Sequence, residues 1–130
     1  MDEKLSLLAD LIKLANADGQ FKEEEQRFIY AIAQQIGVSP KDYTRLFNEH
    51  IKSTPPKLEI DRIVQFQRLV LLMNVDENSN SDEINMIKNL GLKMGLNPIA
   101  IKQVLSEMHN YPNKMLPPEK LIEIFKLHHN

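Results

Sequence analysis

The sequence predicts an all-α protein: a seven-helix bundle made of two tandem three-helix repeats and a C-terminal helix. Three observations predict this fold class. Apolar residues recur at intervals of three and four along most of the chain, which is the period of an amphipathic helix. No stretch alternates apolar and polar residues for long enough to indicate a strand. Finally, the chain aligns with itself at an offset of 58 positions, as a duplicated unit would (residue 16 aligns with residue 74).

The self-alignment places residues 16–47 on residues 74–105 without a gap. The apolar positions match, and the identical pairs include turn and capping residues as well as core residues: Asn16/Asn74, Asp18/Asp76, Glu25/Glu83, Ile29/Ile87, Gly37/Gly95 and Pro40/Pro98. We therefore expect one domain over residues 1–130. Its parts are repeat one at about 3–51, repeat two at about 58–110 and a C-terminal helix at about 118–128.

The first repeat is expected to form helices over about 3–17 and 22–36, followed by a third that begins at Pro40. Gly37 follows the second helix, where a left-handed backbone is least costly because glycine has no Cβ. Ser39 is then a hydroxyl N-cap, and Pro40 occupies the first helical position, where its missing N–H does no harm.

The second repeat begins after Pro55-Pro56, which interrupts any helix. Its first helix, about 58–73, is apolar on most faces and is expected to be the buried central helix. The same turn and cap chemistry then recurs at Gly95, Asn97 and Pro98. Pro117-Pro118 precedes the final amphipathic helix.

Composition excludes several functional classes. The chain is 42% hydrophobic and 26% charged, which is typical of a globular protein. It has no cysteine, so disulfides, thiolate zinc sites and cysteine nucleophiles are excluded. The net charge of −2 gives no reason to expect a nucleic-acid partner, and charges interrupt every apolar stretch, so no membrane insertion is expected. The first residues lack the pattern of a signal peptide, and a cytoplasmic location is the expectation.

Two acidic loops, residues 16–25 and 74–83, follow the first helix of each repeat. Each places an aspartate just past a helix and a glutamate seven residues later: Asp18 with Glu25, and Asp76 with Glu83. Carboxylate oxygens are the ligands that Ca²⁺ and Mg²⁺ prefer, so these four residues are the candidate metal ligands. None of the registers that begin at residues 16, 74 or 76 supplies both the glycine and the final glutamate of an EF-hand.

The same residues also fit a purely structural role. Aspartate and asparagine favour turns, because their side chains bond to nearby backbone groups. A glutamate in the first helical turn meets the positive end of the helix dipole and can close a capping box, as Glu83 can with Asn80. Capping and metal binding both remain open at this point.

The pattern Ala17-Asp18-Gly19, with an apolar Phe21 and then Glu25 between two apolar helices, resembles the TerB-like family. That family is named for tellurite-resistance protein B and includes the TerB-like region of a DnaJ-type membrane co-chaperone. The resemblance covers residues 5 to about 105 and implies an all-helical bundle, a role in bacterial stress response and a divalent metal held by the acidic loops. Those ligands correspond to Asp18 and Glu25, with Asp76 and Glu83 in the second copy, which departs from the pattern at Glu77 and Ser79.

The leading functional hypothesis is a non-enzymatic TerB-like module that binds a protein partner and a divalent cation, Ca²⁺ or Mg²⁺. One alternative is a helical scaffold without a ligand, in which a homodimer buries the face of the C-terminal helix. A more remote alternative is a metal-assisted hydrolase that uses the same carboxylates. We expect no catalytic site, because the sequence offers acids but no histidine near them and no glycine-rich phosphate loop.

Overall fold

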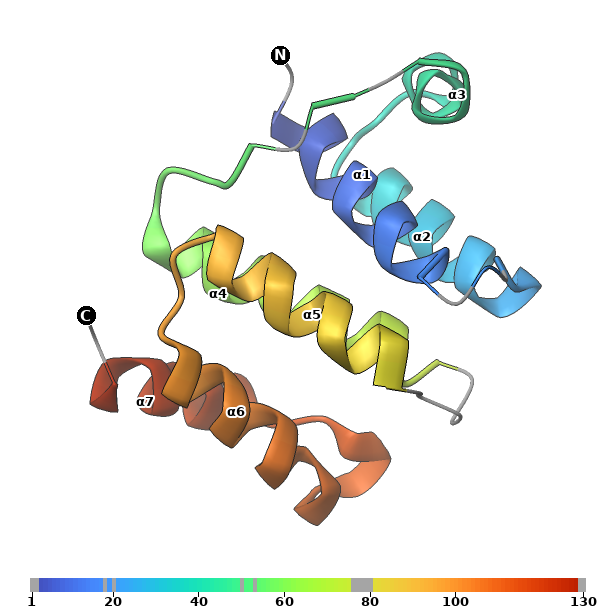
Figure 1. Ribbon diagram of the computed structural model, residues 1–130. Coiled ribbons are helices and arrows are strands. Elements are labelled where there is room, and N and C mark those ends of the chain that lie inside the picture. Colours follow the sequence, from blue (N-terminus) through green and yellow to red (C-terminus); the bar gives the residue numbers. More distant parts are fainter. Residues whose placement is uncertain are drawn as a thin grey trace.

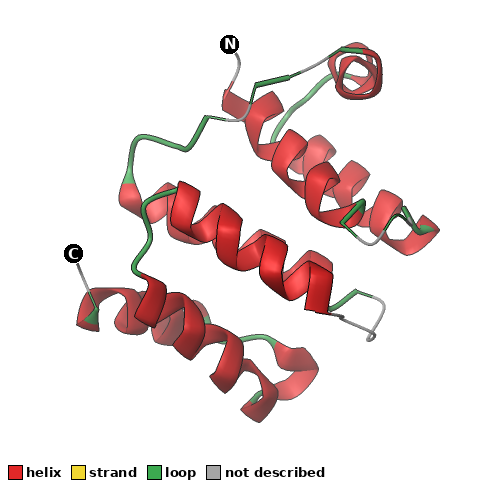
Figure 2. Cartoon of the chain, in the orientation of Figure 1, coloured by secondary structure: helices red, strands yellow, loops and turns green. Residues whose placement is uncertain are grey.

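A computed structural model describes residues 3–17, 19, 21–49, 51–52, 54–75 and 81–128. Within these residues all regular structure is helical (Figure 2), and the predicted all-α class is confirmed. The helices are α1 (Glu3–Ala15), α2 (Glu23–Gln35), α3 (Pro40–Asn48), α4 (Glu59–Met73), α5 (Ser81–Lys93), α6 (Pro98–Glu107) and α7 (Pro118–Leu127). Two short 3₁₀ helices, η1 (Met108–Asn110) and η2 (Pro112–Lys114), join α6 to α7.

The helices pair into layers, with one helix at the periphery. Figure 1 shows α1 beside α2, α4 beside α5, and α6 beside α7, while α3 lies at the edge of the molecule. The first layer packs on the second through contacts of α1 with α4 and α5. The third layer packs on the second through α5–α6 and α4–α7 contacts, whereas α3 packs mainly against α1.

One hydrophobic core runs through all three layers. Its fully buried side chains include Leu8 and Leu11 from α1 and Phe66 and Leu69 from α4. Helix α4 contacts α1, α2, α5 and α7, so the predicted central position is confirmed, while Ile60 and Val64 in its first half are exposed. None of the described helices is long and apolar enough to cross a membrane.

The local signals for helix ends are confirmed. Gly37 and Gly95 have φ of +84° and +78°, the left-handed conformation that glycine adopts without strain. The backbone N–H of Asp42 donates to Ser39 Oγ (3.2 Å), and that of Ile99 donates to Asn97 Oδ1 (2.8 Å). These side chains cap α3 and α6 as the sequence predicts.

The structure differs from the prediction made from the sequence at two points. Helix α1 ends at Ala15 rather than residue 17, because the N–H of Ala17 bonds to the carbonyl of Leu14 and tightens the last turn. Residues 108–114 form two 3₁₀ helices that the sequence did not predict, with Asn113 and Lys114 at positive φ. Met115 is exposed in this connection.

The helix bounds keep the predicted offset of 58 residues. Helices α2 and α5 begin at residues 23 and 81, and α3 and α6 begin at residues 40 and 98. After α2 the N–H of Val38 donates to the carbonyl of Ala33 (2.9 Å), and after α5 the N–H of Leu96 donates to that of Gly91 (3.1 Å). The third helices pack differently, since α3 lies on α1 whereas α6 lies on α5 and α7. We call the two three-helix units, α1–α3 and α4–α6, the two trios. That the two trios superimpose remains a prediction.

Candidate functional site

The structure describes half of the predicted metal set. Glu25 and Glu83 lie in the first turns of α2 and α5, and each residue is only 3% exposed. Asp18 and Asp76 lie outside the described residues, as does Asn80, the expected capping partner of Glu83.

Glu25 has a structural role at the start of α2. The backbone N–H of Lys22 donates to Glu25 Oε1 at 3.1 Å, which is the glutamate half of a capping box. The carboxylate also lies at the positive end of the helix dipole, where a negative charge is favoured. Capping therefore gives the buried carboxylate of Glu25 a hydrogen-bond partner.

A metal site needs a group of convergent ligands. No three histidine, aspartate or glutamate side chains form such a group within the described parts of the chain. The four-residue loop site therefore stays a prediction. The hydrolase hypothesis requires the same ligand group, which the described residues do not form.

The histidines serve no common site among the described residues. His50 and His129 fall outside the described ranges, and His109 is exposed. The ring nitrogen Nε2 of His128 lies 2.8 Å from Gln103 Oε1 and links the end of α7 to α6.

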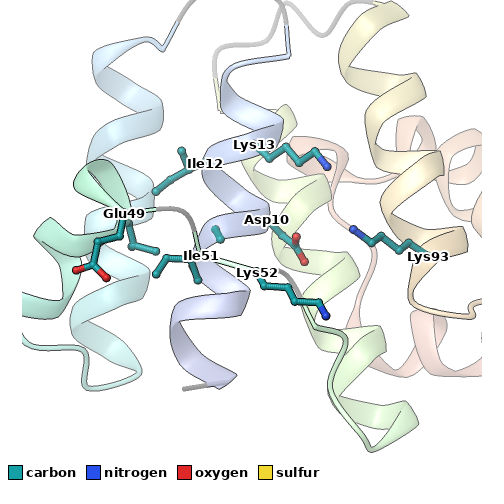
Figure 3. Close-up of a pocket in the computed structure, with 9 residues that line it drawn as sticks. Asp10, Ile12, Lys13, Glu49, Ile51, Lys52 and Lys93 are labelled. Atoms are coloured by element: carbon teal, nitrogen blue, oxygen red, sulfur yellow. The ribbon is translucent and has the colours of Figure 1, made fainter. Parts of the chain in front are cut away.

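A pocket of about 450 Å³, which we call the basic pocket, lies where α1, α3, the segment after α3 and α5 meet. Three lysines line it: Lys13 from the last turn of α1, Lys52 after α3, and Lys93 from the last turn of α5. Figure 3 shows their ammonium groups arranged around the carboxylate of Asp10. The floor and walls are largely apolar and are formed by Ala9, Ile12, Leu46 and Ile51.

Sequence reasoning missed this pocket. Its lysines come from three separate segments, so no spacing rule groups them before the helices pack. One local signal was present: Asp10 lies among the apolar residues of α1 and is only 5% exposed. Acidic side chains are rarely buried without a partner, and Asp10 does take part in an interaction.

A second surface gathers half of the eight aromatic residues and is formed by α3, by α2 and by the loop just before α2. We call it the aromatic surface, and it consists of Phe21, Tyr30, Tyr43 and Phe47. Ring centroids lie 6.3 Å apart for Phe21–Phe47, 5.4 Å for Tyr43–Phe47 and 5.1 Å for Tyr30–Tyr43. Phe47 is 50% exposed and Tyr30 is 41% exposed, so the cluster lies at the protein surface.

Burial raises the pKa of the Tyr43 phenol, and the neighbouring Tyr30 adds to the shift. Both effects disfavour the phenolate, because a buried charge loses hydration and a second phenolate nearby repels it. Tyr43 is therefore neutral over the physiological range and acts as an apolar ring with a hydroxyl group.

Fold and surfaces together define an all-α domain with a basic pocket and an exposed aromatic surface. Residues 1–48 match the family model described as tellurite resistance protein TerB. The matched residues include α1, α2 and α3 and end before α4, so the predicted resemblance is confirmed over this part of the chain. No curated protein and no solved structure matched the chain.

Proposed function

We propose that this chain is a non-enzymatic TerB-like module that binds a protein partner in a bacterial stress-response system. The aromatic surface carries the proposal, because it is exposed and lies within the residues that match the TerB model. The family match supports the stress-response context.

The aromatic surface has the composition of a binding site. None of the nine residues of α3, all of them described, is buried. Tyr43 packs against the core only in part, and Phe47 and Tyr30 remain exposed. A hydrophobic patch that stays exposed often marks an interaction site. Tyrosine and phenylalanine are enriched where protein interfaces are fully buried, and a few such residues usually dominate the binding energy.

Site-specific cross-linking in cells tests this role. The photo-reactive residue p-benzoylphenylalanine is placed at position 47, and at position 127 as a control, because Leu127 is also exposed but lies on α7. We expect one defined protein to cross-link from position 47, not from position 127, and to be lost when Tyr30→Ser is added. Equal cross-linking from both positions would contradict a specific surface.

A homodimer is the competing occupant. Sedimentation of the purified protein, of Phe47→Ser and of Leu127→Ser separates the cases. A dimer lost only in Phe47→Ser makes a second copy the partner of the aromatic surface. A dimer lost only in Leu127→Ser favours the scaffold alternative, in which helix α7 forms the interface.

The proposed module also binds Ca²⁺ or Mg²⁺ through Asp18, Glu25, Asp76 and Glu83. The spacing of the acids in both loops supports this part, and the capping role of Glu25 competes with it. A cation at 100 times its dissociation constant stabilises the native state by about 2.7 kcal/mol, which a thermal melt detects. Asp18→Asn should abolish the rise in Tm, whereas the exposed Asp82→Asn should keep it. A wild-type Tm that no ion changes would remove metal binding from the proposal.

We also propose that the two trios are copies of one unit. Helix bounds and the hydrogen bonds that end α2 and α5 recur at the offset of 58 residues, which supports duplication. An experimental structure tests this by superposition of residues 5–47 on residues 63–105. Failure of these two three-helix units to superimpose would reject the duplication.

A further inference from the structure

We propose that the basic pocket binds a small anion that carries a short apolar chain, a class that includes alkyl phosphates and alkyl carboxylates. This inference rests on the pocket alone and is independent of the aromatic surface and of the acidic loops.

The ammonium groups of the three pocket lysines are available to a ligand. Lys13, Lys52 and Lys93 are exposed, and none of them forms a hydrogen bond or an ion pair with another described residue. Three ammonium groups around a single carboxylate, that of Asp10, leave a net positive charge, which favours an incoming anion.

The two acids of the pocket do not cancel this charge. The carboxylate of Glu49 accepts two hydrogen bonds from Arg45, from Nε at 3.0 Å and from Nη2 at 3.4 Å. Glu49 is therefore already paired, and Asp10 alone opposes the three lysines. The pocket is a local excess of positive charge in a chain whose net charge is −2.

The shape of the pocket selects an anion with an apolar part. Its volume of about 450 Å³ lies within the range of small-ligand sites, about 300–1,000 Å³. A bare phosphate would leave most of this space, and its apolar walls, in contact with water. A short alkyl chain would cover Ile12, Leu46 and Ile51, while its charged end reaches the lysines.

Titration monitored by amide NMR tests the proposal, with hexyl phosphate as the probe and inorganic phosphate as its comparison. We expect hexyl phosphate to shift the amide signals of α1, of residues 51–52 and of the end of α5, and to bind more tightly than inorganic phosphate. Added salt should weaken the binding, because it screens exposed charges. Equal affinity for the two probes would reject the apolar part, and no localised shift with either probe would overturn the proposal.

Variants that remove a charge from the pocket test the proposal in two directions, because loss of the lysines should weaken anion binding and loss of Asp10 should tighten it. The triple variant Lys13→Gln, Lys52→Gln, Lys93→Gln should weaken hexyl phosphate binding about tenfold, since each exposed charge pair contributes little alone but three are lost. A matched triple variant, Lys88→Gln, Lys102→Gln, Lys126→Gln, changes the net charge equally but lies outside the pocket, and should keep the affinity. Asp10→Asn removes the opposing charge and should tighten binding. Equal weakening by the two triple variants would show a general charge effect and overturn the site.

The same anionic chemistry occurs in free metabolites and in lipid headgroups. Vesicles of phosphatidylcholine with phosphatidic acid, compared with phosphatidylcholine alone, distinguish the sources. Co-sedimentation that depends on the pocket lysines supports the pocket with a lipid as its ligand. Hexyl phosphate binding without co-sedimentation supports it with a soluble ligand.

Discussion

Helices α3 and α6 occupy corresponding places in the two trios, yet the chain uses them differently. Helix α6 packs between α5 and α7 and buries four residues: Ala100, Ile101, Val104 and Leu105. Helix α3 packs on α1 and buries none of its nine residues. At the offset of 58 residues, Tyr43 corresponds to Ile101 and Phe47 to Leu105. Aliphatic side chains thus fill the core in one trio, whereas in the other Tyr43 is only partly buried and Phe47 is half exposed.

A single position helps to explain the difference. Gly91 in α5 faces α6, and a Cβ at this position would lie 2.6 Å from Ile101 Cδ1 and 3.2 Å from Phe66 Cε1. Glycine therefore permits the close approach of α6 to α5. The corresponding residue in α2 is Ala33, and α3 packs mainly on α1 instead. Without an equivalent of α7 over it, α3 leaves its aromatic side chains available for a partner.

The comparison of α3 with α6 predicts that the largest difference in stability comes from truncating corresponding side chains in these two helices. Ile101→Ala should lower the free energy of unfolding by about 2–5 kcal/mol, because it leaves a cavity in a packed core. The corresponding Tyr43→Ala should cost about 1 kcal/mol, because Tyr43 is only partly buried. Urea denaturation of both variants measures the two losses. Equal losses would show that α3 belongs to the core as fully as α6 does.

The next largest loss of stability is expected when the close approach of α6 to α5 is obstructed. Gly91→Ala introduces a methyl group against Ile101 and Phe66, and overpacking of this kind costs about 1–3 kcal/mol. Alanine's better helix propensity offsets part of that, about 1 kcal/mol. We expect a net loss in chemical denaturation, and lower stability for Ala33→Gly as well, through loss of helix propensity and of a buried methyl group. A Gly91→Ala variant more stable than wild type would show that α6 does not depend on this contact.

The sequence predicted the features that local chemistry determines. Glycine at a helix end, a hydroxyl or amide cap and a following proline act over a few residues, so Gly37, Ser39 and Pro40 could be interpreted without tertiary structure. The apolar character of residues 58–73 likewise predicted the central position of α4, although Leu58, Ile60 and Val64 at its beginning remain exposed.

Features that depend on packing could not be predicted in this way. The apolar positions of α3 and α6 follow the same spacing, so periodicity did not show that one helix is peripheral and the other buried. Lys13, Lys52 and Lys93 are distant in sequence, and each alone is typical of a solvated surface. The basic pocket exists only because α1, α5 and the segment after α3 meet.

Removal of a helix N-cap is expected to lower stability by a smaller amount. Comparing the caps of α3 and α6 tests whether they contribute equally to the stability of the protein. Ser39→Ala and Asn97→Ala each remove a side-chain acceptor at a helix N-terminus, and such losses cost about 0.5–2 kcal/mol. Asn97→Ala should lose more, because its side chain accepts from both Ile99 and Ala100 and its helix belongs to the core. Thermal melts of the two variants, with the exposed Thr44→Ala as a reference, measure the difference. A greater loss for Ser39→Ala would contradict the peripheral role of α3.

The smallest effect concerns pH and the aromatic surface. The Tyr43 pKa is raised above its ordinary value of 10.0 in the folded state. The native state therefore holds this proton more tightly than the unfolded chain, and the associated stability is fully present below pH 10.0. It is lost as the pH rises through the folded-state pKa. Denaturation at about pH 8 and about pH 11, on either side of the usual tyrosine pKa, should show a smaller decline in Tyr43→Phe than in wild type. The control Tyr111→Phe, outside the aromatic surface, should decline as wild type does. A Tyr43→Phe decline equal to that of wild type would show that α3 leaves this phenol as hydrated in the folded protein as in the unfolded chain.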